Sequence, residues 1–262
     1  MKLTVLMENT ACRDEMVCEH GLSLYIEANG QRILFDAGQT GAFADNAERL
    51  GIDLRQVDLC VLSHGHYDHG GGLGHFLEIN DHAKVYVSRH AFGDYYNAEE
   101  KYIGLDWALL GEERIVFVGD NLTLSDTLSL HTCEAFPQPY FTPASGLMVK
   151  RRDMMVPDDF RHEMYLLIRE GARRILISGC SHKGVMNIKT WFAPDVFIGG
   201  FHLMKLDPVQ EATRLKFTAM ELLKQDTVYY TGHCTGDKQF AALKGYMGER
   251  LHALSTGITL EI

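Results

Sequence analysis

Short apolar runs separated by polar and glycine-containing segments mark the first third of the chain, which predicts short strands alternating with loops. Runs at 2–7, 21–27 and 31–35 are expected strands. The last two flank Asn29-Gly30, a strong hairpin turn signal. Further strands are expected at 57–62 and 84–88, and a helix at 42–50 that ends at Gly51.

The second half interleaves strands with helices. Strands are expected at 165–169, 174–178, 196–198, 227–230 and 257–262. Asp207-Pro208 is expected to open a helix, with Asp as the N-cap and Pro at the first helical position. Apolar residues then recur on one helical face, at Ala212, Leu215, Ala219, Leu222 and Leu223. A second helix is expected at 237–247. This pattern predicts an α/β or α+β fold with sizeable sheets and helices on their outer faces.

Composition is that of an ordinary globular protein, with 46% hydrophobic and 23% charged residues among 262. No repeat or Pro/Ser-rich linker divides the chain, so we expect a single domain over residues 1–262. No apolar run suits a signal peptide or a transmembrane helix. The six cysteines lack a C-x-x-C pair and the close spacing of a disulfide scaffold, which predicts reduced thiols and a cytoplasmic location.

The net charge of −10 narrows the choice of partner. Nucleic-acid affinity rests on Lys and Arg neutralising phosphates, so this acidic balance disfavours DNA or RNA binding. We expect a small-molecule substrate and no membrane partner. The oligomeric state is left open.

Four candidate metal-binding side chains lie in the motif His64-x-His66-x-Asp68-His69, which comes directly after the apolar run 57–62 and before three glycines. Imidazole and carboxylate are ligands of Zn²⁺, Fe and Mn²⁺. A solvated polar loop is the alternative, but such a loop holds four such residues only rarely by chance. The motif therefore predicts a metal site, and its tight loop allows His64 and His66 to face one metal while Asp68 and His69 face a second.

Two metals with open water positions need ligands from other strand ends. His182 follows the run 174–178, and His233 follows the run 227–230, each flanked by glycine. For each, an ordinary loop histidine is the competing interpretation.

Together with Asp36 in Leu34-Phe35-Asp36-Ala37-Gly38, these motifs resemble the metallo-β-lactamase fold superfamily. Further segments resemble the branch named for a dihydropterin-linked ribofuranosyl-aminobenzene phosphate synthase: Glu19-His20-Gly21, Gly179-Cys180-Ser181-His182, Gly199-Gly200-Phe201-His202 and His233-Cys234-Thr235-Gly236. The resemblance spans nearly the whole chain. It is specific evidence for the fold and for metal binding, and weak evidence for the identity of the substrate.

The resemblance implies a four-layer αββα sandwich with the metal site at one edge. It implies one metal on His64, His66 and a third His, and another on Asp68, His69 and His233. Asp36 would hold the ligand loop from behind. The chain departs from the family pattern at Cys180, where most related hydrolases have a bridging Asp. We favour His182 as the ligand, with Cys180 as a possible extra ligand, and leave His131 unassigned.

The expected cofactors are two divalent metal ions, zinc first, with Mn or Fe as alternatives. A metal lowers the pKa of bound water from 15.7 to about 7, and Asp68 would orient that water as the catalytic carboxylate. We expect a hydrolase, or a related lyase or transferase, acting on a small phosphorylated or heterocyclic, pterin-like compound. The alternatives are thioester or lactone hydrolysis, a di-iron redox protein and a non-catalytic metal-binding module.

Evidence on the substrate is thinner. His20 and His202 are candidates for the rim of the cleft, and for each a structural histidine is the alternative. The stretch 135–145 holds three aromatic residues among three prolines. It would either form an aromatic wall over the site or be a surface loop pinned by its own aromatic side chains.

Overall fold

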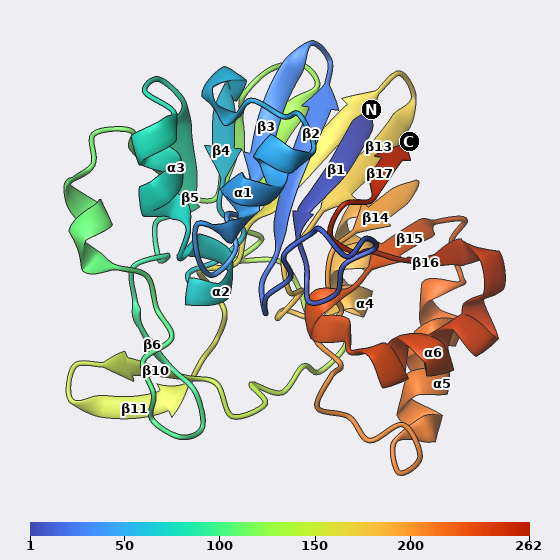
Figure 1. The fold of residues 1–262 in the computed structure, drawn as a ribbon. Coiled ribbons are helices and arrows are strands. Elements are labelled where there is room, and N and C mark those ends of the chain that lie inside the picture. Colours follow the sequence, from blue (N-terminus) through green and yellow to red (C-terminus); the bar gives the residue numbers. More distant parts are fainter.

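The computed structural model describes all residues from 1 to 262 and contains two seven-stranded sheets packed face to face. Figure 1 shows helices on the outer side of each sheet, which gives four layers. The fold class predicted from the sequence, a four-layer αββα sandwich, is confirmed.

The first sheet has the strand order β17-β1-β2-β3-β4-β5-β7. Its strands are β1 (Lys2–Met7), β2 (Ser23–Ala28), β3 (Gln31–Phe35), β4 (Leu59–Val61), β5 (Lys84–Ser88), β7 (Ile115–Val118) and β17 (Thr259–Glu261). Strands β3, β4, β5 and β7 run parallel, whereas β17, β1, β2 and β3 are antiparallel neighbours. The hairpin between β2 and β3 turns at Asn29 and Gly30, both with positive φ, as the Asn-Gly signal predicts.

The second sheet has the order β16-β15-β14-β13-β12-β9-β8. Its strands are β8 (Asn121–Thr123), β9 (Leu128–His131), β12 (Tyr165–Glu170), β13 (Arg173–Ile177), β14 (Val196–Ile198), β15 (Val228–Thr231) and β16 (Leu251–Ala253). Strands β13 to β16 are parallel. Each sheet thus has a parallel half, and the carboxyl ends of parallel strands meet at one edge.

Alternation along the strands sorts apolar side chains into separate cores. In β4, Leu59 and Val61 pack between the two sheets, while Cys60 faces the outer helices. In β14, Val196 and Ile198 face the inner core, while Phe197 faces outward. Because successive strand residues point to opposite faces, one short apolar run fills two cores.

Helices cover both outer faces. On the first sheet these are α1 (Ala42–Arg49) and α3 (Leu73–Ile79), with the short α2 (Tyr67–Gly70) at the sheet edge. On the second sheet they are α4 (Val185–Phe192), α5 (Ala212–Leu222) and α6 (Asp237–Met247). Short 3₁₀ segments lie at Leu54–Gln56, Trp107–Gly111, His233–Thr235 and Gly248–Arg250.

A third, three-stranded sheet of β6 (Asp94–Tyr96), β10 (Met148–Arg151) and β11 (Met154–Pro157) projects from the sandwich at the lower left of Figure 1. The sequence did not predict it. Its strands have few buried positions and therefore little apolar patterning. The helix expected from Asp207 begins instead at Ala212, because the Asp207 carboxylate accepts the N–H groups of Val209 and Gln210 in a separate turn.

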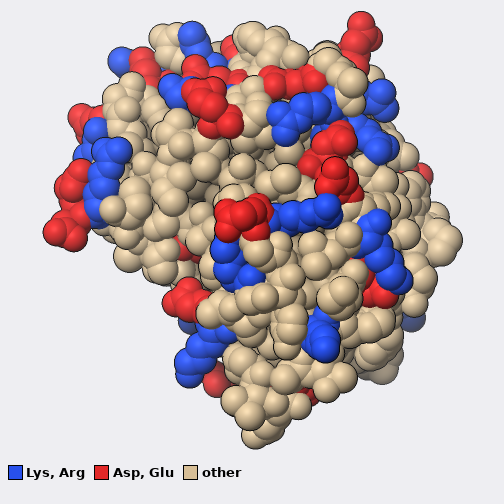
Figure 2. All heavy atoms as spheres, turned by 90° about the vertical axis from the view of Figure 1, so that its right-hand side faces the viewer, with Lys and Arg blue, Asp and Glu red and all other residues tan.

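None of the helices combines the length and apolarity needed to cross a bilayer. On the face that carries α5 and α6, Figure 2 shows Lys and Arg interspersed with Asp and Glu, without a broad field of one sign.

Candidate metal centre

The candidate centre lies where the carboxyl ends of the parallel strands of both sheets meet. Asp36 follows β3, and the motif His64–His69 follows β4. From the second sheet, Cys180 and His182 follow β13, and His233 follows β15. Asp36 N–H donates to Val61 O at 2.9 Å, which extends the β3–β4 ladder and brings Asp36 beside Ser63.

Asp36 holds the motif in place through hydrogen bonds to Ser63 and His69. Its Oδ1 accepts the Ser63 N–H at 2.7 Å, and its Oδ2 accepts the Ser63 hydroxyl at 2.7 Å and His69 Nδ1–H at 2.6 Å. The same Ser63 Oγ lies 2.8 Å from His64 Nδ1 and, with its own proton given to Asp36, accepts from it. This network places a proton on Nδ1 of His64 and of His69 and turns the Nε2 of each ring into the centre.

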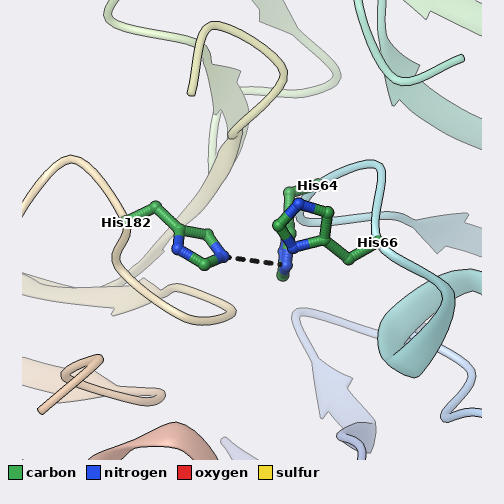
Figure 3. A group of neighbouring side chains, drawn as sticks. All are labelled: His64, His66 and His182. Carbon is green, nitrogen blue, oxygen red and sulfur yellow. Dashed lines mark hydrogen bonds between the residues drawn. The ribbon is translucent and has the colours of Figure 1, made fainter. Parts of the chain in front are cut away.

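The first cluster comprises His64, His66 and His182, all buried (Figure 3). His64 Nε2 and His182 Nε2 face each other at 3.3 Å. His66 comes from the loop beside His64, and its Nε2 has no hydrogen-bond partner, nor does His182 Nδ1. Buried polar atoms without partners are rare, and each calls for an explanation.

His162 lies behind His66 and has no free nitrogen. Its Nδ1 accepts the Gly65 N–H at 2.9 Å, and its Nε2–H donates to Asp158 at 3.0 Å. His162 therefore fixes the backbone between His64 and His66 instead of offering a ligand atom.

The second cluster joins Asp68, His69 and His233 to the half-exposed His20. Asp68 Oδ2 lies 3.3 Å from His233 Nε2 and 3.5 Å from His20 Nε2. His69 Nε2 and His233 Nε2 face each other at 3.1 Å. Asn9, after β1, accepts His233 Nδ1–H at 2.8 Å, which leaves the Nε2 lone pair of His233 directed at the centre.

Cys180 lies beside the second cluster, with its Sγ 3.2 Å from His69 Nε2. It also forms a group with His202 and Cys234 on its other side. The ring of His202 is 4.3 Å from that of His182. Both His182 and Cys180 therefore face the centre, each toward a different cluster.

The charge states of the buried side chains favour cation binding. Burial lowers the pKa of His66 to about 3 and holds those of His64 and His182 well below the usual range, so these rings are neutral. Burial alone would lower the pKa of His69 as well, but Asp36 and Asp68 raise it to about 9. The second cluster thus attracts positive charge. Burial raises the pKa of the Cys180 thiol.

Buried carboxylates anchor the two ligand loops of the second sheet. Glu163 accepts the N–H groups of His182 at 2.6 Å and Lys183 at 3.0 Å. Glu8 accepts the N–H of His233, and burial raises its pKa. Asp36 and His233 have φ of 60° and 47°, in a region that non-glycine residues seldom occupy. Such strained positions cluster at functional sites.

The donor set fits a divalent metal. Within each cluster, two Nε2 atoms face each other at 3.1 and 3.3 Å, an arrangement that needs a proton or a cation between them. Two nitrogens bound to one tetrahedral zinc at 2.0–2.1 Å are themselves about 3.3 Å apart.

The structure brings all six predicted ligand residues together, with Cys180 and the two rim candidates His20 and His202 beside them. His131 lies apart: its ring packs 5.3 Å from that of Phe192 in α4, and Ser129 and Asn121 contact its two ring nitrogens. Four supporting residues were missed from the sequence: Glu8, Asn9, Asp158 and His162. Only Asp158 and His162 could have been linked from the sequence, because they are four residues apart and can form a hydrogen bond.

The sequence profile of the metallo-beta-lactamase superfamily matches residues 17–106. An uncharacterized protein of Methanocaldococcus jannaschii is 32% identical over 251 residues, covering 92% of this chain and 93% of its own. The chain belongs to the metallo-β-lactamase superfamily, whose members are metal-dependent enzymes.

Two further relatives place it more closely. The 7,8-dihydropterin-6-methyl-4-(β-D-ribofuranosyl)-aminobenzene-5'-phosphate synthase of M. jannaschii is 32% identical over 268 residues, covering 90% of this chain and 88% of its own. The crystal structure of Tm1679, a metal-dependent hydrolase of the β-lactamase superfamily, superposes with a TM-score of 0.86 at 26% identity, covering 100% and 99% of the two chains.

Proposed function

We propose that the chain is a dinuclear-metal-dependent hydrolase, or a related lyase or transferase, acting on a small phosphorylated or heterocyclic compound. The observation that carries this proposal is the pair of facing nitrogen contacts, one in each cluster at the same sheet edge. In this proposal His64, His66 and His182 hold one metal, and Asp68, His69 and His233 hold the other. Zinc is the first expectation, with Mn or Fe as alternatives.

When bound, the metals would supply Lewis acidity and a hydroxide nucleophile at neutral pH. The chain supplies orientation. Asp68 is ionised, because the charge of His69 and the contact with His233 outweigh its burial and lower its pKa. Asp68 would hold one metal through its carboxylate and orient the attacking water. His20, with half of its side chain exposed, lies on the solvent side of Asp68 and forms the rim.

The name of the 32%-identical synthase supports a pterin-linked phosphorylated substrate, and the likeness to Tm1679, a metal-dependent hydrolase, supports hydrolysis. Hydrolysis of a thioester or lactone is a second candidate, because the same clusters can polarise any acyl carbonyl. We propose the whole chain as one catalytic domain, because both sheets contribute to the site.

The first test is metal content, measured by plasma mass spectrometry on protein purified without added metal or chelator. It is paired with a screen of phosphomonoester, phosphodiester, thioester and lactone substrates. We expect about two equivalents per chain and turnover in one class. Two equivalents of iron without hydrolysis would replace the proposal with a redox function. One tightly held metal without activity would indicate a binding module.

Substitutions test the assignment of ligands. His66→Ala and Asp68→Ala are expected to abolish activity and to lower metal content while the fold survives, as checked by circular dichroism. His182→Ala is expected to lose at least one equivalent, whereas Cys180→Ala keeps both. Full metal content in His182→Ala with a loss in Cys180→Ala would transfer the role to Cys180.

A further inference from the structure

A cavity of about 310 Å³ adjoins the candidate centre on the side of His182. Buried Ser181, which precedes His182 in the chain, and half-buried His202 line it, and the ring of His202 lies 4.3 Å from that of His182. Arg214 and Phe217 of α5, both exposed, also line it. The cavity therefore leads from solvent toward the first cluster.

Aromatic side chains form much of its wall. Phe141 is 87% exposed and Phe217 is 49% exposed, and both line the cavity together with Tyr140. Large exposed aromatic residues that gather around one hollow mark a binding surface better than scattered ones do. Their flat faces suit a planar ring.

The wall is held in place before any ligand arrives. Asn187 of α4 accepts the N–H of Tyr140 at 2.9 Å and donates to its carbonyl at 2.8 Å. The Tyr140 hydroxyl donates to Glu221 at 2.7 Å, and Lys205 Nζ donates to the Ser145 carbonyl at 2.8 Å. Because these contacts fix the loop, little ordering entropy is lost on binding.

The charge of the lining is opposite to that of the protein. Arg214 and Lys205 line the cavity, and no Asp or Glu does, although the chain has a net charge of −10. Arg214 forms no ion pair or hydrogen bond within the chain, so its guanidinium is free to bind an anion.

We propose that this cavity binds a planar aromatic group that carries an anionic substituent. The ring packs against the aromatic wall formed by Tyr140, Phe141 and Phe217, and the anion contacts Arg214. The inference rests on the proposed function in one respect: the reacting bond of the substrate points inward to the metal centre, while the anion stays at the exposed end.

The test is binding, measured by isothermal titration calorimetry on the full chain with three probes of similar size. Naphthalene-2-carboxylate is planar and anionic, naphthalene-2-carboxamide is planar and neutral, and trans-decalin-2-carboxylate is anionic but not planar. We expect the first probe to bind at one site and the other two more weakly.

Matched variants on α5 locate the site. Arg214→Gln is expected to weaken binding of the carboxylate by about three- to tenfold and to leave the carboxamide unchanged. Phe217→Ala is expected to weaken both planar probes by about three- to tenfold. Lys216→Gln and Met220→Ala alter exposed residues of the same helix that do not line the cavity, and should leave binding unchanged.

Absence of binding, or binding of naphthalene-2-carboxylate by both Arg214→Gln and Phe217→Ala as tight as by the unsubstituted protein, would overturn the proposal. So would loss of binding in His66→Ala alone, because the probe would then be held by the metal. The expected binding pattern in a protein that hydrolyses none of the screened substrates would refute the proposed function and support the cavity assignment.

Discussion

Asn9 shows how a single amide can set the chemistry of a remote imidazole. It lies 224 positions from His233 and accepts the proton of its Nδ1 at 2.8 Å. This contact decides which ring nitrogen keeps a free lone pair, and partners of this kind typically change metal affinity by about 10–100-fold.

Asn9→Ala is therefore expected to lower the affinity for one of the two metals by about tenfold, because the ring of His233 loses its preferred tautomer and orientation. Competition with a fluorescent zinc chelator measures the change. Asn121→Ala is the matched control, since Asn121 accepts Nδ1–H of His131 at the same 2.8 Å but away from the centre. Equal losses in the two variants would contradict the role assigned to Asn9.

At the scale of elements, Gly179 lets the end of β13 approach the end of β4. A Cβ at this position would overlap Ser63 Oγ, the group that orients His64. Gly179→Ala is expected to cost about 1–3 kcal/mol of unfolding free energy through overpacking and to lower metal content as His64 is displaced.

Chemical denaturation and metal analysis of the same preparation check both effects. Gly74→Ala in α3 is the control, because no atom lies within 4 Å of the added Cβ. An unchanged metal content in Gly179→Ala would show that the ends of β4 and β13 adjust independently of each other.

Elements with strong local signals were predictable. The bounds of β1, β3, β5, β14 and α6 agree with the sequence prediction, because apolar runs, turn residues and helix periodicity coincide there. The six ligand candidates, each after a strand and most next to glycine, lie together in the structure as expected, while their role as ligands stays a prediction. Short strands such as β8, with a single half-buried position, carry no periodicity to detect. Glu8 and Asn9 act through contacts more than 220 residues away, which spacing alone does not reveal.

The whole molecule places the centre between two sheets that pack through one shared core. Each cluster takes groups from both sheets, so a bound metal joins the two halves of the sandwich. A ligand that binds only the folded state stabilises it by about 2.7 kcal/mol when present at 100 times its dissociation constant.

Removal of metal with a chelator is therefore expected to lower the melting temperature by about 5–10 °C for a chain of this size. Differential scanning calorimetry with and without the chelator measures the shift. His66→Ala, which removes a ligand of one cluster only, should melt between the metal-loaded and the metal-free protein and show a smaller shift with the chelator. A melting temperature that does not change on metal removal would contradict a centre that ties the sheets together.

The pairing of β1 with β17 has a consequence for the order in which the protein is made. Lys2 lies opposite Glu261 in the first sheet, and Glu8 and Asn9 position His233 from the other end of the sequence. During synthesis on the ribosome, His64–His69 emerge more than 160 residues before His233. The second cluster is therefore completed only late in translation, and until then Asp68 and His69 of the nascent chain lack their partner His233.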